Sequence, residues 1–195
     1  KSGSEGDGTS WKSAFGDIQQ AIFQASADSK KHQIWVATGT YYGDTTQSTV
    51  VNLAPGISLY GGFAGTETSL AARDTAKNPT IIDGKSARRV ISQSYGFADS
   101  MAVVVDGFTI QNGKANNGGG INITTNTTIS NCIIKNNAAS EYGSAVYATN
   151  ATIKNTQIIG NTYLSRLYYT VRLNNCVMDS CVVKNNKAYY YGSIY

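Results

Sequence analysis

Histidine, cysteine and acidic residues are scarce in this sequence, and each scarcity removes a class of site. The chain of 195 residues has one His, and its three Cys form no CxxC pair, so no zinc site is expected. Catalysis by a Ser-His-Asp triad would depend on His32, for which a solvated helix terminus is the better interpretation. The net charge is +4, and the basic residues are scattered rather than gathered in a stripe. No nucleic-acid partner is therefore expected.

Proline, leucine and long apolar runs are also rare. The chain has two Pro, and no apolar run approaches the roughly 18 residues that cross a bilayer, so no membrane span is expected within it. Fifteen of the seventeen Asn follow Gly107. A chain rich in Asn, Gly and β-branched residues but poor in helix formers is typical of β structure with many tight turns.

One segment near the N-terminus has the pattern of a helix. Apolar residues recur there at helical spacing, namely Phe15, Ile18, Ile22 and Ala25. This spacing predicts a helix over residues 13–27, with Ser10 or Ser13 as its N-cap. The segment QIWVA at 33–37 is predicted to be a strand. We interpret the helix as a cap on the first turn of a β fold, because an open end would expose core and unpaired backbone.

The second half of the chain repeats itself. SNCIIKNN at 130–137 recurs as KNTQIIGN at 154–161 and as SCVVKNN at 180–186, and DGFTIQNG at 106–113 precedes them. Matching positions in successive copies, taken in chain order, are offset by 24, 24 and 25. A leucine-rich repeat of this length would need Leu at fixed positions, and this half has almost none. Stacked short strands remain, which predicts an all-β, single-stranded right-handed parallel β-helix with an N-terminal capping helix.

The repeat also predicts which side chains stack from coil to coil. Two inward columns are expected, one of Ile129, Ile153 and Val177, the other of Ile110, Ile134, Ile158 and Val183. Asn137, Asn161 and Asn186 should form a ladder whose amides bond between coils. We predict one domain over 1–195, with a flexible start and cap helix at 1–32, irregular coils at 33–105 and regular coils of about 24 residues at 106–195.

Several motifs resemble those of known proteins. They are GTSW at 8–11, IWVATGTYY at 34–42, LYGGFAGTE at 59–67, TIIDG at 80–84 and DGFTI at 106–110. Together they resemble bacterial surface β-helix repeat proteins. GGGI at 118–121, followed by IKNN at 134–137, is similar to the GGA[IL] and FxxN repeats of chlamydial polymorphic outer-membrane proteins, with Ile in place of Phe. The resemblance implies a pectate-lyase-like fold, which carries lyases, hydrolases, adhesins and stalks alike.

Asp83 and Asp106 are the candidates for carboxylate chemistry. Each begins an Asp-Gly pair, and their spacing, one less than the period of 24, predicts neighbouring coils and a separation near 5 Å. Such a pair could share a proton or hold Ca²⁺. The favoured alternative is that each Asp-Gly is a bend between strands, with no metal, no cofactor and no catalysis. The three Cys are interpreted as free thiols, since Cys132 and Cys181 should lie roughly 9.6 Å apart on coils two apart.

Binding is easier to motivate than catalysis. Tyr142, Arg166 and Tyr191 are predicted to share one column. If this column faces outward, it forms an aromatic and cationic ladder of the kind on which sugars stack, which points to polysaccharides or surface glycans as ligands. Tyr columns also arise from solenoid stacking alone.

The sequence therefore favours a non-catalytic bacterial β-helix, secreted or on the outer-membrane surface, that binds glycans or partners in adhesion or acts as a stalk. The alternative is a fragment of a polysaccharide lyase or glycoside hydrolase. YGSIY at 191–195 matches YGSAV at 142–146, so the sequence is expected to stop early in a new coil. This predicts either that the native protein continues or that copies associate end to end at the C-terminal coil.

Overall fold

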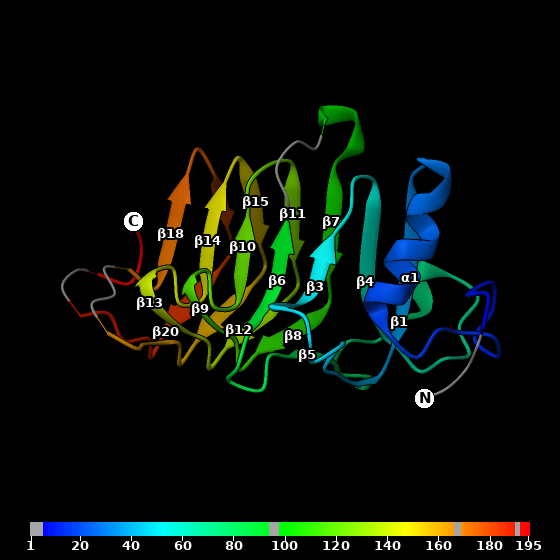
Figure 1. The fold of residues 1–195 in the computed structure, drawn as a ribbon, viewed down its shortest axis with the longest axis horizontal. Coiled ribbons are helices and arrows are strands. Elements are labelled where there is room, and N and C mark those ends of the chain that lie inside the picture. The colour runs from blue at the N-terminus through cyan, green and yellow to red at the C-terminus, as the bar shows by residue number, and fades with distance from the viewer. Residues whose placement is uncertain (1–5, 94–97, 166–168, 190–191) are drawn as a thin grey trace.

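The computed structural model is a parallel β-solenoid of about six coils with one α-helix near its N-terminal end (Figure 1). It describes residues 6–93, 98–165, 169–189 and 192–195. The β-helix predicted from the sequence is confirmed. Every strand pairs in parallel with strands of the neighbouring coils, so the strands form sheets that run along the solenoid axis.

Two sheets of six strands and one of five form the walls of the solenoid, and a short fourth sheet lies between two of them. Sheet A holds β1 (His32–Ala37), β4 (Ile57–Phe63), β7 (Val103–Asp106), β11 (Thr127–Ser130), β15 (Ala151–Lys154) and β19 (Val177–Asp179). Sheet B holds β2 (Gly39–Tyr41), β5 (Thr80–Asp83), β8 (Phe108–Gln111), β12 (Ile133–Lys135), β16 (Gln157–Ile159) and β20 (Val182–Lys184). Sheet D holds β9 (Lys114–Asn117), β13 (Ala138–Tyr142) and β17 (Thr162–Tyr163). Sheet C holds β3 (Thr49–Leu53), β6 (Arg89–Gln93), β10 (Ile121–Ile123), β14 (Val146–Thr149) and β18 (Val171–Asn174). Three 3-10 helices lie in the connections, at Ser26–Asp28, Leu70–Ala72 and Asp99–Met101.

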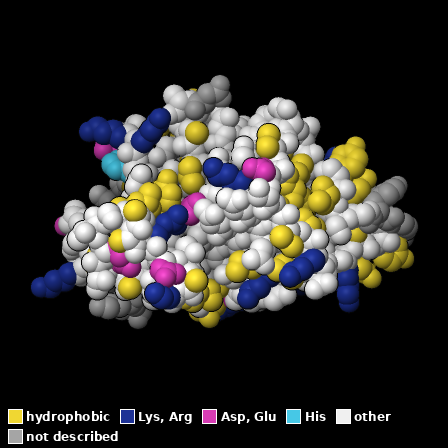
Figure 2. Space-filling view, turned by 180° about the vertical axis from the view of Figure 1, so that it is seen from behind, with side chains coloured by type: hydrophobic (Ala, Val, Ile, Leu, Met, Phe, Trp, Pro, Cys, Tyr) yellow, Lys and Arg dark blue, Asp and Glu magenta, His cyan; other side chains and the backbone are white. Residues whose placement is uncertain are grey.

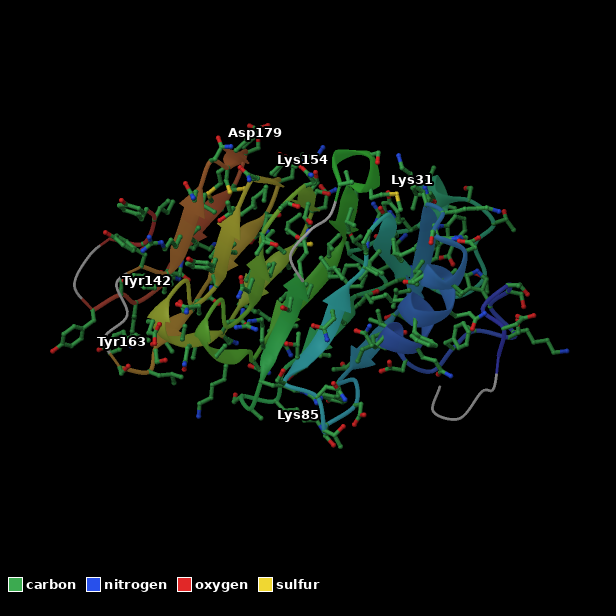
Figure 3. All side chains as sticks on the ribbon, turned by 45° about the horizontal axis from the view of Figure 1, so that its top comes forward. Lys31, Lys85, Tyr142, Lys154, Tyr163 and Asp179 are labelled. Carbon is green, nitrogen blue, oxygen red and sulfur yellow. The ribbon has the colours of Figure 1, made fainter. Side chains whose placement is uncertain are left out.

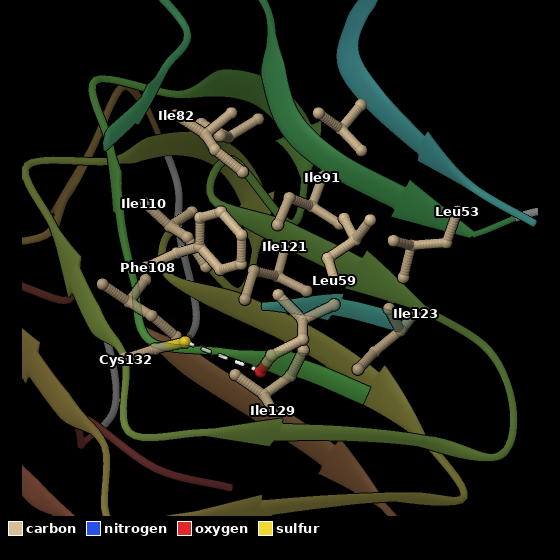
Figure 4. Packing of buried hydrophobic residues seen from close by; sticks show 14 of the residues in the cluster. Leu53, Leu59, Ile82, Ile91, Phe108, Ile110, Ile121, Ile123, Ile129 and Cys132 are labelled. Atoms are coloured by element: carbon tan, nitrogen blue, oxygen red, sulfur yellow. Dashed lines mark hydrogen bonds between the residues drawn. The ribbon is translucent and has the colours of Figure 1, made fainter. Parts of the chain in front are cut away.

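Inward side chains from sheets A, B and C fill the interior (Figure 4). The predicted column of Ile110, Ile134, Ile158 and Val183 is confirmed by the strand register. The other predicted column is wrong at its last member, because Ile153 pairs with Met178, while Val177 points outward and is 59% exposed. Ala139 pairs with Tyr163 at an offset of 24, but Val146 pairs with Val171 at 25. This coil therefore has one extra residue between β17 and β18, and the strand pairings that follow have an offset of 25 instead of 24.

Left-handed residues at three corners explain the abundance of Asn. One corner has positive φ at Gly107, Asn131, Asn155 and Ser180, a second at Asn112, Asn136, Gly160 and Asn185, and a third at Asn126, Asn150 and Asn175. Asn tolerates this conformation better than other residues with a side chain, because its short amide bonds locally. The same corner conformation in successive coils keeps the strands in register.

The predicted Asn ladder is confirmed and lies inside the solenoid. Asn137 and Asn161 are fully buried. The Oδ1 atom of Asn161 accepts from the backbone N–H of Asn137 at 2.9 Å and from its Nδ2 at 3.0 Å. The same two bonds, each 2.9 Å long, link Asn161 to Asn186 in the next coil. The ladder therefore replaces backbone pairing at a corner where the strands of sheets B and D are interrupted.

The cap helix α1 (Ile18–Ala25) is shorter than predicted and begins at a different residue. Its N-cap is Asp17, whose carboxylate accepts from the backbone N–H of Gln20, whereas Ser10 and Ser13 bond each other in the preceding loop. The amide of Gln19 pairs with both the N–H and the C=O of Asn52 in β3. The helix thus covers core with Ile18 and Ile22 and satisfies an edge strand with one side chain. Among the described residues, no helix is long and apolar enough to cross a membrane.

Candidate functional site

Asp83 lies at the end of β5 and is held by structural hydrogen bonds. It is 6% exposed. Its Oδ1 atom accepts from the backbone N–H of Lys85 at 2.8 Å. Its Oδ2 atom accepts from Gln111 Nε2 at 2.7 Å and from Asn112 Nδ2 at 2.8 Å. Both oxygens are therefore occupied, one in fixing the bend after β5 and the other in joining it to the next coil.

Asp106 lies at the end of β7, in a different sheet. Its carboxylate accepts from a guanidinium nitrogen of Arg73, from the hydroxyl of Ser130 and from Asn131 Nδ2. Arg73 comes from the connection between β4 and β5, and also donates to the carbonyl oxygen of Gly61 at 3.0 Å. Gly107, with φ +80°, lies close by, and a Cβ there would come within 2.9 Å of Arg73 Nη1. The Arg73 side chain thus joins Asp106 of the DGFTI motif to Gly61 of the LYGGF motif.

The expected pairing of Asp83 with Asp106 is wrong. Asp83 pairs in register with Gln111 of sheet B, whereas Asp106 pairs with Ser130 of sheet A. A sequence spacing close to one coil length does not by itself place two residues side by side, because the two Asp-Gly motifs occupy different corners of their coils. No group of three or more His, Cys, Asp or Glu side chains within the described ranges is arranged to hold a metal ion.

The other reactive side chains have structural partners. The His32 Nε2 atom lies 2.7 Å from Asp28 Oδ1, and this hydrogen bond lowers the pKa of Asp28. All three Cys are free thiols. Cys132 is buried, and burial raises its pKa to about 12. Its thiol points to the carbonyl oxygen of Val105 in the core (Figure 4).

Tyr142, the described member of the predicted ligand column, belongs to a cluster of aromatic and basic side chains at the C-terminal coils. Arg166 and Tyr191 lie outside the described residues, so their place in the column stays a prediction. The guanidinium of Arg172 lies 4.4 Å from the ring centre of Tyr142, 5.9 Å from that of Tyr147 and 5.4 Å from that of Tyr195. We call these four residues the aromatic patch; Figure 3 shows Tyr142 at this end of the solenoid.

Tyr147 and Arg172 of the aromatic patch lie on sheet C, whose strands are labelled in Figure 1, whereas Tyr142 ends β13 of sheet D. Tyr147 of β14 pairs in register with Arg172 of β18, so both side chains point outward in one column. Tyr195 continues this column, since its N–H and C=O bond to the backbone of Val171 and Leu173. The result is a hollow of about 210 Å³ whose lining includes Tyr147, Arg172 and Tyr195. Thr149 and Asn174 add a hydroxyl and an amide to its wall.

Tyr147, Arg172 and Tyr195 were missed by reasoning from the sequence. The signal that could have found them is the match of VYAT at 146–149 with VRLN at 171–174, which are offset by 25 rather than by 24. Because side chains alternate along a strand, a match of Val146 with Val171 places the next residue of each strand on the outer face.

A family model described as Protein of unknown function (DUF1565) matches residues 2–187. The search of curated proteins and the search of solved structures found no match.

Proposed function

The chain belongs to the DUF1565 family, whose function is unknown, and we propose from its own surface that it is a non-catalytic β-helix that binds glycans through the aromatic patch. The observation that carries the proposal is the position of Arg172, which contacts three Tyr rings and lines, with Tyr147 and Tyr195, a hollow with polar walls. Sugars present apolar faces that stack on aromatic rings and hydroxyl groups that bond to guanidinium, amide and hydroxyl groups. The hollow offers both kinds of contact.

The proposed setting is the outer surface of a bacterium or the medium around it, in adhesion or as a stalk. It is supported by the resemblance of the LYGGFAGTE and DGFTI motifs to those of bacterial surface β-helix proteins. Asp83 and Asp106 are assigned no chemistry in this proposal, because their carboxylate oxygens already bond to side chains and backbone of the fold.

Binding of oligosaccharides to an array of neutral and acidic glycans tests the proposal. For a glycan that binds, Tyr147→Ala should weaken affinity roughly two- to tenfold, since an aromatic stacking contact contributes about 0.5–1.5 kcal/mol. Tyr147→Phe should retain most of the affinity. Tyr163→Ala is the matched control, because Tyr163 is 37% exposed and packs edge-on against Tyr189 outside the hollow. Equal losses in Tyr147→Ala and Tyr163→Ala, or no glycan bound by the parent, would overturn the proposal.

A second copy of the chain is the proposed partner at the last coil. Ile153 and Ile158 are fully buried, whereas Met178 and Val183, which follow them in the same columns, are only half-buried. Val177, Val182 and Ile194 of this end are exposed, and Figure 2 shows hydrophobic side chains on the surface here as well as elsewhere. Sedimentation velocity over a range of concentrations should show a dimer that Val182→Lys disrupts, since Val182 of β20 is 47% exposed. A parent that sediments as a monomer throughout would contradict this association.

A further inference from the structure

A second hollow, which we call the basic groove, lies on the early coils and has a volume of about 440 Å³. Its lining residues come from three segments, the connection before β3, the start of β6 and the start of β9. They are residues 45–48, 87–89 and 114–115. Arg88, Arg89 and Lys114 supply three positive charges, and no acidic side chain is part of this lining.

Arg88 holds one wall of the basic groove in place. It is 7% exposed, and its guanidinium donates to the backbone carbonyl oxygens of Tyr42, Gly43, Asp44 and Gln47. The carboxylate of Asp44 accepts instead from the backbone N–H and hydroxyl of Thr46, each at 2.9 Å. The loop is therefore fixed by a buried cation whose hydrogen bonds go to carbonyl dipoles rather than to a carboxylate.

Arg89 and Lys114 form the opposite wall. The Nε and Nη2 atoms of Arg89 donate to the carbonyl oxygens of Asn117 and Gly118, and burial lowers the pKa of Arg89. Lys114 is exposed, and its backbone N–H is fixed to the carbonyl oxygen of Arg88 at 2.9 Å. The four ion pairs found among the described residues include none of the three groove cations. Because the charge of Arg88 also acts on the nearby Asp44 carboxylate, the excess positive charge of the groove lies mainly on Arg89 and Lys114, and it attracts anions.

Hydroxyl and amide groups complete the basic groove. Thr45, Gln47 and Ser48 line it together with Arg89 and Lys114. Donor groups from several chain segments line the groove, and such a lining suits an oxyanion, which presents acceptors in several directions. Lys85, labelled in Figure 3, lies outside this lining, and its ammonium is 4.1 Å from the ring centre of Tyr42, whose carbonyl oxygen accepts from Arg88.

The basic groove and the aromatic patch are joined by a single strand pairing. Lys114 begins β9, and Asn117 at the other end of that strand pairs with Tyr142. A strand of this length spans on the order of 10 Å, and the step to Tyr142 on the neighbouring strand adds about 5 Å. An oligosaccharide of a few residues could contact both places at once.

We infer that the basic groove binds a sulfate or phosphate ester, carried by the glycan that occupies the aromatic patch. The identity of the carrier rests on the proposed function, whereas the oxyanion site depends only on the groove.

The oxyanion site is tested first without any glycan. Inorganic sulfate, and separately inorganic phosphate, is titrated into the parent protein at constant ionic strength with chloride as the reference anion, and backbone amide shifts are followed by NMR. Saturable shifts confined to the lining at residues 45–48, 87–89 and 114–115 are expected. Lys114→Gln should weaken the apparent affinity roughly two- to fivefold. Shifts spread over all Lys and Arg positions, or unchanged in Lys114→Gln, would overturn the site.

The second test uses a heparin-derived oligosaccharide, its desulfated counterpart and a phosphorylated mannan oligosaccharide, which together separate sulfate from phosphate. The esterified ligands should bind more tightly than the desulfated one, and Lys114→Gln should remove much of that gain. Lys154→Gln is the matched control, because it removes the same charge from an exposed position in sheet A. Equal loss in both variants would sink the inference while leaving the aromatic patch intact. If inorganic sulfate shifts the groove resonances but no oligosaccharide binds, the oxyanion site stands. The proposed glycan-binding function and the glycan as carrier of the ester are then refuted.

Discussion

Replacement of Asn161 by Ala tests the Asn ladder at its centre. Asn161 is fully buried. Its Oδ1 atom serves two donors of Asn137, and its Nδ2 atom donates to the carbonyl oxygen of Ile134 at 3.0 Å and to Asn186 Oδ1 at 2.9 Å. In Asn161→Ala the buried N–H of Asn137 loses its acceptor. One unsatisfied buried donor costs about 1–3 kcal/mol, and loss of the Nδ2 bonds brings the expected destabilisation to about 2–4 kcal/mol.

Urea denaturation of the parent and of two variants measures this effect. Asn116→Ala is the matched control, because Asn116 lies on an exposed position of β9 and its Oδ1 atom accepts only from the Ser140 hydroxyl among the bonds described. That variant should lie within about 0.5 kcal/mol of the parent. A midpoint for Asn161→Ala no lower than that of Asn116→Ala, at equal slope, would refute the role of the ladder.

Asn161→Asp separates the acceptor role from the donor role. The carboxylate can still accept from Asn137, but it faces the carbonyl oxygen of Ile134 and Asn186 Oδ1, to which the amide donated. Burial and this repulsion should raise the carboxyl pKa in the folded state above about 3.9, its unfolded value. The native state then binds the proton more tightly, so this variant should gain stability as the pH falls from neutral toward the unfolded pKa. A stability that falls with acidification as in the parent would contradict the geometry.

Three further predictions concern other parts of the fold. Cys132 should resist a thiol reagent at mildly alkaline pH in the native protein and react in urea, as peptide mass spectrometry would show; rapid native labelling would contradict its burial. Met178→Asp should lower the melting temperature by several degrees, since it places a charge in the core column, whereas Val177→Asp should leave the melting temperature near that of the parent. The opposite order would support the register expected from the sequence instead. Glu67 accepts from the backbone N–H groups of residues 64–66, and these hydrogen bonds lower its pKa. Its contribution to stability is therefore present above the pKa of the unfolded state and is lost as the pH falls through the pKa of the folded state. The melting temperature of Glu67→Gln should depend less on acid pH than that of the parent.

Most of the fold could be predicted from the sequence repeat, because one period constrains every coil at once. Two independent motifs at the same offset placed Ile110, Ile134 and Ile158 in one column and Asn137 above Asn161, and the register agrees. A period says nothing about single insertions between motifs. The extra residue before β18 therefore moved Met178 into the place expected for Val177.

The helix boundary and the carboxylates were harder to predict, because local patterns admit several solutions. Ser10, Ser13 and Asp17 are all good N-caps, and only the packing of Ile18 and Ile22 on the first coil selects Asp17. The Asp-Gly motif occurs at two different corners, so sequence spacing could not show whether Asp83 and Asp106 meet. Predicting the aromatic patch requires the register of β14 against β18, and the position of Tyr142 in the sequence does not reveal that register.

The Asn ladder also bears on how the chain folds. Each strand pairs only with the coils before and after it, so the stability of the solenoid is close to a sum of coil energies and nearest-neighbour couplings. In such a linear array, order spreads from wherever two coils first stack, and each added coil repeats the same modest loop closure of about 24 residues. A buried amide bonded to both neighbours strengthens the coupling rather than the coil itself. Asn161 thereby couples its own coil to the coils on either side, and we expect these three coils to unfold together.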